Sequence, residues 1–126
     1  MKSNRYPTAE QKRHHDELRE LGSILTQSKP VEIAHCHGGS MIDTFGYKIN
    51  PGWSQRQNHW LVIPLTPEQH NNEKDSLDRG VRNWEKRHHT QVILLEWVSH
   101  LTGINVFEKA GLDYEFRTES AWTYSS

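Results

Sequence analysis

Two apolar segments constrain the fold more than any other feature of this sequence. Residues 60–65 form a short continuous apolar run of the kind found in buried strands. Residues 92–101 place apolar side chains on more than one face of a predicted helix, so we expect that helix at the centre of the core. Because only 33% of the 126 residues are hydrophobic, the other elements must be largely polar and must pack around these two.

Length, charge and cysteine content narrow the class of protein. A chain of 126 residues is expected to form one domain. No apolar run approaches the roughly 20 residues of a membrane span, and residues 1–15 lack the apolar stretch of a signal peptide, so we expect a cytoplasmic protein without a membrane partner. The single Cys36 excludes an internal disulfide and a paired-cysteine zinc clamp. A formal net charge of −1 means that any binding of nucleic acid depends on local clusters.

The N-terminal half carries clear helix and strand signals. Thr8 and Gln11 match a capping box and predict a helix over residues 8–22, docked at the edge of the fold. Alternating residues at 31–35 predict a short strand. Residues 38–58 are rich in glycine and polar side chains, which predicts a long loop, with a strand near Thr44 to Ile49 as an option.

The C-terminal half is predicted to be helical. Thr66 and Gln69 form a second capping-box signal directly after the apolar strand. Two more helices are expected over residues 76–88 and 90–101, and residues 110–126 have no clear period and are interpreted as a tail or a partner-binding arm. The predicted class is α+β, organised in one domain as follows: a helical arm over residues 1–30, a core over 31–80, C-terminal helices over 81–109 and a tail over 110–126.

Nine histidines are present, and four of them fall near predicted element ends. His35 ends the first strand, His37 follows it, His59 opens the second strand, and His70 lies on the next helix. Phosphodiester hydrolysis uses a base that is neutral near pH 7, which imidazole provides. It also uses a cation where negative charge grows in the transition state. The order of strand, loop, strand and helix with these histidines is typical of a ββα-metal finger.

The segments IAHCHGGSM, NHWLVIPLTPEQHNN and VRNWEKRHHTQV, within residues 31–102, resemble a known family. They are similar to the phage and prophage HNH (His-Me finger, ββα-metal) endonucleases related to the recombination-enhancement nuclease. The resemblance implies that His35 is the general base and that His70 is the metal ligand on the helix. It places His59 at the polar position that opens the second strand, with a catalytic or metal-binding role, and Asn58 is the alternative occupant. It also implies DNA as the substrate, a bacterial host cytoplasm, and a recombination protein or nucleoprotein filament as a partner.

Departures from the family pattern bear on the metal. Ala34 stands where a ligand often precedes the base, Lys74 stands where a second helix histidine often follows, and Thr66 and Gln69 occupy frequent cysteine positions. A site with fewer protein ligands suits a hydrated Mg²⁺ or Mn²⁺ better than a closed Zn²⁺ site, with Zn²⁺ kept as an option.

The remaining predictions concern DNA contact. The densest cation clusters are Lys12 with Arg13 and Lys86 with Arg87, and Trp53 in the polar loop is the aromatic candidate for base contact. The adjacent pairs His14-His15 and His88-His89 are expected on solvated helix faces.

Three functions compete at this point. The leading hypothesis is a divalent-metal-dependent DNA endonuclease. The alternative is a catalytically inactive DNA- or protein-binding module on the same scaffold, and a third hypothesis is a zinc-stabilised adaptor.

Overall fold

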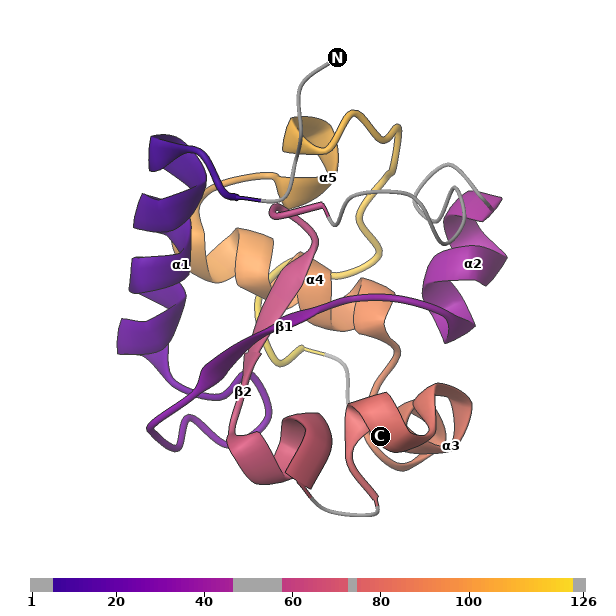
Figure 1. Cartoon of the computed structure of the whole chain (residues 1–126). Coiled ribbons are helices and arrows are strands. Elements are labelled where there is room, and N and C mark those ends of the chain that lie inside the picture. Colours follow the sequence, from indigo (N-terminus) through magenta and orange to yellow (C-terminus); the bar gives the residue numbers. More distant parts are fainter. Residues whose placement is uncertain (1–5, 47–57, 73–74, 124–126) are drawn as a thin grey trace.

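Helix α4 (Gln91–Thr102) lies at the centre of the protein (Figure 1), and nine of its 12 residues are buried. The computed structural model describes residues 6–46, 58–72 and 75–123. Thr90 begins α4 by accepting a hydrogen bond from the Ile93 amide, and Gly103 ends it in a left-handed conformation. The predicted central core helix is therefore confirmed. Within the described ranges, no helix combines the length and apolar character needed to cross a lipid bilayer.

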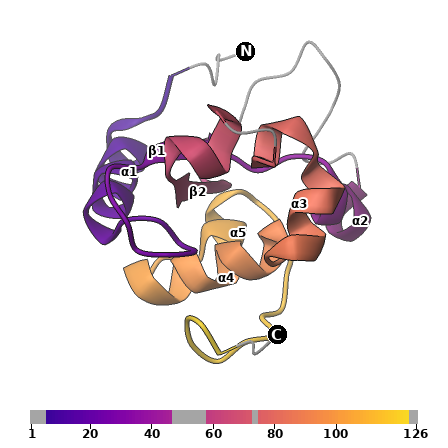
Figure 2. The same ribbon diagram turned by 90° about the horizontal axis from the view of Figure 1, so that it is seen from below.

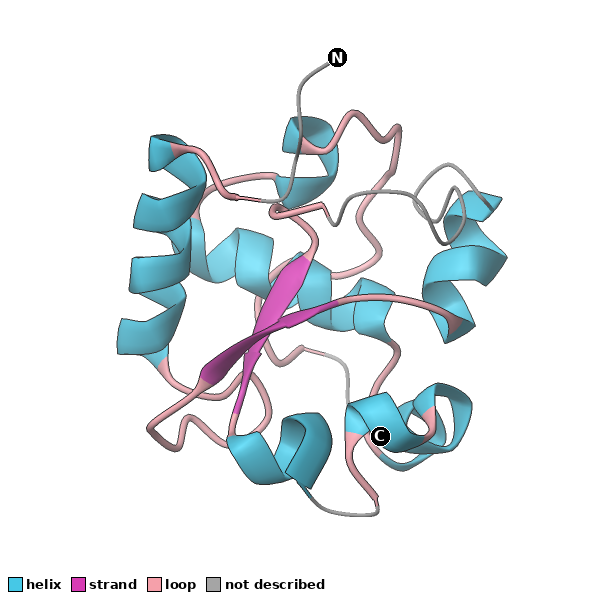
Figure 3. Ribbon diagram, in the orientation of Figure 1, coloured by secondary structure: helices cyan, strands magenta, loops and turns pink. Residues whose placement is uncertain are grey.

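A two-stranded antiparallel sheet packs against α4. Strand β1 (Glu32–His35) pairs with β2 (Val62–Leu65), with Ala34 opposite Ile63 and His35 opposite Val62. All four residues of β2 are buried because this strand lies against the core helix. Figure 2 shows the two strands between α4 and the helical turn that follows β2, and Figure 3 shows how much of the fold around them is helical. Both predicted strands are confirmed, and the fold is of mixed α+β class.

Helix α1 (Ala9–Leu21) covers one end of the sheet and contacts α4, β1 and β2. The capping box forms as predicted: the Thr8 amide donates to Gln11 Oε1 at 2.7 Å, and the Gln11 amide donates to Thr8 Oγ1 at 3.2 Å. The expectation that His14 and His15 are solvated is wrong. Only 1% of His14 and 6% of His15 is exposed, because these residues share the inward face of α1 with Leu18.

The expected loop over residues 38–58 begins as a helix. Helix α2 (Gly39–Phe45) starts directly after Gly38, and its Met41 side chain is fully buried in the core. This burial favours a helix in a segment whose glycines predicted a loop. The optional strand near residues 44–49 is wrong at Thr44 and Phe45, and Trp53 lies outside the described residues.

Beyond β2, the chain forms short helical elements. The Thr66–Gln69 capping box is present, with hydrogen bonds of 2.9 and 3.3 Å, and it opens one π-helical turn, η2 (Glu68–Asn72). The helix predicted over residues 76–88 is divided at Gly80 into a 3₁₀ turn, η3 (Leu77–Arg79), and helix α3 (Val81–Arg87). The Gly80 backbone is nearly fully extended, with φ of 176°, which ends the first element before the second begins. Assignment of residues 31–80 to a ββα-metal core stays a proposal.

The C-terminal segment packs onto α4 after the short helix α5 (Val106–Lys109), which was not predicted as a separate element. Its anchor is the buried carboxylate of Glu96, which accepts hydrogen bonds from the Arg117 amide, from the amide and hydroxyl of Thr118, and from the Tyr114 hydroxyl. Burial and the neighbouring Glu96 raise the pKa of Tyr114. The described part of the tail is thus held against the core.

We expect Glu96→Gln to lower the free energy of unfolding by about 2–3 kcal/mol. The side-chain amide replaces one accepting oxygen with an NH₂ group, which cannot accept hydrogen bonds from the surrounding donors. Urea unfolding of Glu96→Gln and wild type measures this difference. Glu115→Gln, an exposed change in the same segment, is the control and should stay within about 0.5 kcal/mol of wild type. Equal stability of Glu96→Gln and wild type would show that the carboxylate does not anchor the segment.

A second stability prediction concerns His14. Burial, followed by the charge of His15, lowers the pKa of His14 to about 4, and neither ring nitrogen has a hydrogen-bond partner among the described residues. Below the ordinary pKa of 6.5, the unfolded chain binds this proton and the folded chain does not. Stability is therefore present above pH 6.5 and is lost as the pH falls toward 4, by on the order of 3 kcal/mol.

We expect His14→Phe to keep the ring packing against Trp60 and to remove this part of the pH dependence. Urea unfolding of both proteins at about pH 7 and about pH 5 gives the comparison. The variant should gain stability relative to wild type at the lower pH. If the difference in unfolding free energy between the two proteins is the same at both pH values, the result would contradict the buried neutral state of His14.

Candidate active site

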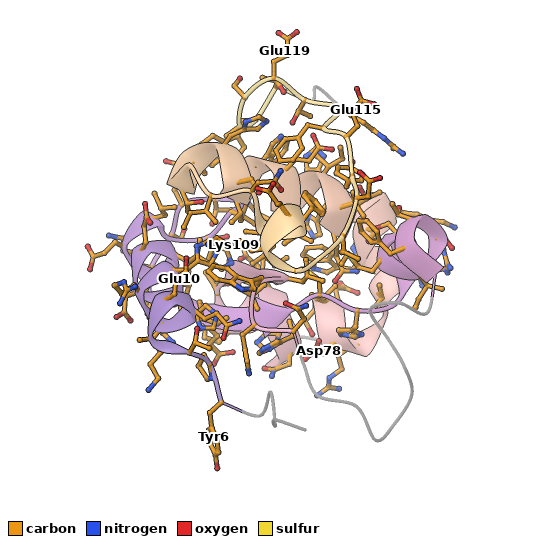
Figure 4. All side chains as sticks on the ribbon, turned by 90° about the horizontal axis from the view of Figure 1, so that it is seen from above. Tyr6, Glu10, Asp78, Lys109, Glu115 and Glu119 are labelled. Atoms are coloured by element: carbon orange, nitrogen blue, oxygen red, sulfur yellow. The ribbon has the colours of Figure 1, made fainter. Side chains whose placement is uncertain are left out.

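An open pocket of about 420 Å³ lies where the end of β1 meets η2 and η3. Its lining consists of His35, His37, His70 and Asp78. Figure 4 shows Asp78 on the opposite side of the molecule from Glu115 and Glu119 of the C-terminal segment. Antiparallel pairing places the end of β2 beside Glu32 at the start of β1, and η2 follows directly, so its His70 contacts Glu32 and lines the pocket together with His35 from the end of β1.

His35 is the last residue of β1, and its ring is paired with a second imidazole. His35 Nε2 lies 3.1 Å from His59 Nδ1, and the two rings meet edge to face. Burial, followed by the neighbouring charge of His59 and of other histidines, lowers the pKa of His35 to about 4. The ring is therefore neutral at pH 7, and one ring of the pair donates the shared hydrogen bond while the other accepts it.

His59 supports His35 from outside the pocket. It lies in the turn before β2, is only 5% exposed, and is not among the residues that line the cavity. Its carbonyl accepts a hydrogen bond of 2.8 Å from His15 Nε2 on α1. Burial also lowers the pKa of His15. The contact between α1 and this turn therefore fixes the position from which His59 reaches His35.

His70 lies between two carboxylates. Its Nδ1 is 2.9 Å from Glu32 Oε1, and its Nε2 is 3.2 Å from Asp78 Oδ2. The side chain is 16% exposed, so the ring faces the pocket from a partly buried position. Each of these contacts requires either a proton on the ring nitrogen or a cation between the nitrogen and the oxygen.

Asp78 and His37 complete the lining, and neither was assigned a function from the sequence. His37 Nε2 lies 3.1 Å from Asp78 Oδ1, so the two oxygens of Asp78 contact two different imidazoles. Nothing in the local pattern distinguishes Asp78 from a solvated helix residue. His37 already stood out in the sequence through its position two residues after His35, beside the paired glycines, but without an assigned role.

Buried hydrogen bonds anchor the backbone of His37. The fully buried Gln91 side chain accepts from the His37 amide at 3.0 Å and donates to the His37 carbonyl at 2.9 Å. Glu85 on α3 in turn accepts from the Gln91 amide at 2.8 Å and from the Ser40 hydroxyl at 2.6 Å. The loop carrying His37 is therefore joined to the first turns of both α2 and α4.

The other predicted site residues lie away from the pocket lining. Asn58 Oδ1 accepts a hydrogen bond of 2.9 Å from the Trp60 amide, which uses its side chain within a turn. The proposed DNA-binding cations are exposed on two separate helices, Lys12 and Arg13 on α1 and Lys86 and Arg87 on α3. Arg87 also donates to the Asp75 carbonyl at 2.7 Å.

No group of three or more His, Cys, Asp or Glu side chains among residues 6–46, 58–72 and 75–123 is arranged, as it stands, to hold a metal ion. The donor types at the pocket, imidazole and carboxylate, are nevertheless those that bind divalent cations. Comparison with protein-family models, curated proteins and solved structures gives no match for this chain. The candidate site therefore depends on its own geometry.

The paired glycines where α2 begins provide a test of how this segment is built. Gly39 has a φ of +47°, and a Cβ added there would lie 2.4 Å from Glu85 Oε1 and 2.8 Å from Val81 Cγ1. We expect Gly39→Ala to cost about 2–4 kcal/mol of unfolding free energy, because it adds a clash with hydrogen-bonded Glu85 to the backbone strain. The matched control is Gly46→Ala at the other end of α2, where φ is +66° and an added Cβ would meet no atom of the described residues within 4 Å, with an expected cost of about 1–2 kcal/mol. Equal costs in urea unfolding would contradict the close approach at Gly39.

Proposed function

We propose that this protein is a divalent-metal-dependent DNA endonuclease whose active site is the pocket lined by His35, His70 and Asp78. The observation that carries the proposal is that one pocket combines an imidazole anchored by a second imidazole with an imidazole–carboxylate pair suited to a cation. Hydrolysis of a phosphodiester uses these two functions together.

His35 is the proposed general base. Its Nε2 is engaged by His59, which leaves Nδ1 as the atom that accepts the proton of the attacking water. In this tautomer, Nε2–H donates to His59 Nδ1, so His59 orients the ring in the way that a second residue orients the base of a catalytic triad. His59 is therefore proposed as a positioning residue for His35.

His70 and Asp78 are proposed to hold the divalent cation. Glu32 contacts Nδ1 of His70 and so directs Nε2 toward Asp78 and the pocket. The bound cation would stabilise the negative charge that develops on the phosphate oxygens. The donor set fits Mn²⁺ or Zn²⁺ as well as a hydrated Mg²⁺.

Duplex or single-stranded DNA is the proposed substrate, and the arrangement of the helices favours α3 as its nearest contact. Helix α3 carries Lys86 and Arg87 and packs against η3, which carries Asp78. Lys12 and Arg13 lie on α1, which packs against the sheet and α4, and are proposed as a second contact. A recombination protein or nucleoprotein filament remains a proposed partner.

We expect His35→Ala to reduce cleavage of supercoiled plasmid by roughly 10²–10⁴-fold, the usual contribution of a general base. Nicking assays with Mg²⁺, Mn²⁺, Zn²⁺ and EDTA measure this loss, and thermal melting confirms that the variant is folded. His100→Ala is the histidine control, since His100 contacts Thr118 in the C-terminal segment and does not line the pocket. It should retain the activity of wild type.

Two results would overturn the proposal. Full activity in folded His35→Ala would remove His35 as the base. If wild type cleaves neither supercoiled, linear nor single-stranded DNA in the presence of metal, the inactive binding module becomes the favoured function. The affinity of the protein for DNA would then test that module.

A further inference from the structure

We propose that His37, Asp78 and His70 together form the divalent-metal site, with His59 outside it. This inference deepens the proposed function, on which it rests for the use of the metal in catalysis. It differs from the assignment by sequence, which joined His70 with His59. It also names a transition-metal ion in place of Mg²⁺ as the preferred occupant.

The arrangement around Asp78 carries the inference. His37 Nε2 lies 3.1 Å from Oδ1, and His70 Nε2 lies 3.2 Å from Oδ2, so two imidazole nitrogens contact one carboxylate from separate elements. Ligand atoms bound to one cation through bonds of about 2.0–2.2 Å lie roughly 3 Å apart when they are adjacent in the coordination shell. The nitrogen–oxygen distances at the pocket are already close to this spacing.

The His70 imidazole and the His37 backbone are each held by a further contact. Glu32 Oε1 lies 2.9 Å from His70 Nδ1, which is the carboxylate–histidine contact that commonly supports a metal ligand. The buried side-chain amide of Gln91 makes two hydrogen bonds to the backbone of His37. These bonds fix the backbone from which the His37 side chain extends. The site therefore has supporting contacts on both sides of the pocket.

Two of the three side chains, His37 and Asp78, also have the freedom to move toward an ion. In the described structure, each imidazole contacts its own oxygen of Asp78, and a cation would require the two nitrogens to turn toward one shared point. The exposed fractions of 49% for the His37 side chain and 37% for Asp78 leave room for this rotation. The pocket of about 420 Å³ has space for water or a phosphate oxygen at the remaining coordination positions.

His59 lacks these properties. Its Nδ1 is engaged by His35, it is only 5% exposed, and it does not line the pocket. A metal at Nδ1 of His59 would replace the contact that orients His35. The base and the cation are therefore expected to use separate imidazoles.

The donor set selects the class of metal. Two imidazoles and one carboxylate suit Mn²⁺, Co²⁺ or Zn²⁺, whereas Mg²⁺ prefers oxygen ligands. We expect the full chain, purified with EDTA and then dialysed, to bind one Co²⁺ with visible d–d absorption. Zn²⁺ should displace this ion, and Mg²⁺ at similar concentration should not.

Variants separate the two ligand sets. Asp78→Asn and His37→Ala should each weaken Co²⁺ binding by at least roughly 10–100-fold, and Glu32→Gln should weaken it by about that range through His70. His59→Ala should leave Co²⁺ affinity unchanged. Asp113→Asn, an exposed change in the C-terminal segment, is the control for Asp78→Asn, and His100→Ala is the control for His37→Ala. Thermal melting of each apo variant confirms folding, and Asp78 and His37 are exposed enough for substitution.

The outcomes are distinct. No binding of Co²⁺, Mn²⁺ or Zn²⁺ by wild type would overturn the inference, as would binding that survives Asp78→Asn and His37→Ala but is lost in His59→Ala. Metal binding with the expected variant pattern, but without DNA cleavage, would support the site and overturn the proposed nuclease function. Mg²⁺-driven cleavage that is unaffected by Asp78→Asn would support nuclease activity but overturn this site, together with the role of Asp78 in holding the cation.

Discussion

The carboxylate of Glu85 joins three helices beneath the candidate site. From α3, it accepts hydrogen bonds from Ser40 at the start of α2 and from the backbone amide and side chain of Gln91 at the start of α4. Gln91 then holds the backbone of His37. One half-buried anion thus satisfies donors at two helix starts, where the peptide dipoles favour negative charge. Without it, Ser40 and Gln91 would lose a shared acceptor, and with it one of the contacts that position Gln91 against His37.

The same chain uses histidine in two different environments. His14 and His15 lie on the inward face of α1, where burial lowers their pKa and keeps them neutral. His37 and His70 face carboxylates at an open pocket, where a proton or a cation satisfies both partners. The pair of His35 and His59 connects these environments, because His59 is contacted by His15 on one side and by His35 on the other. A high histidine count therefore does not mark a single site.

Local signals in the sequence predicted the elements whose determinants are local. The capping pairs Thr8–Gln11 and Thr66–Gln69 form as expected because their hydrogen bonds join residues three apart. Helix α2 and the fixed C-terminal segment were missed because they depend on distant burial, of Met41 in the core and of Glu96 beneath residues 114–118. At the site, His35 and His70 could be selected from their places at element ends. Asp78 could not, because only the backbone course through η3 brings it to His37 and His70.

Surface charge gives the last constraint on how a nearly neutral chain could contact DNA. Ion pairs engage Arg19 with Asp16, Arg82 with Asp43, and Lys109 with Glu10, and Figure 4 shows the last pair where the start of α1 meets α5. Exposed pairs of this kind contribute little stability, about 0–1 kcal/mol, but each one cancels a cation that could contact phosphate. Within the described ranges, Lys12, Arg13 and Lys86 make no ion pair. Of these, Lys86 lies on α3, which packs against η3, the element that carries Asp78 of the pocket lining. A phosphate bound by Lys86 near the pocket would be repelled by the negative charge of Asp78 unless a cation is bound at that carboxylate. Binding of substrate and binding of metal would therefore depend on each other.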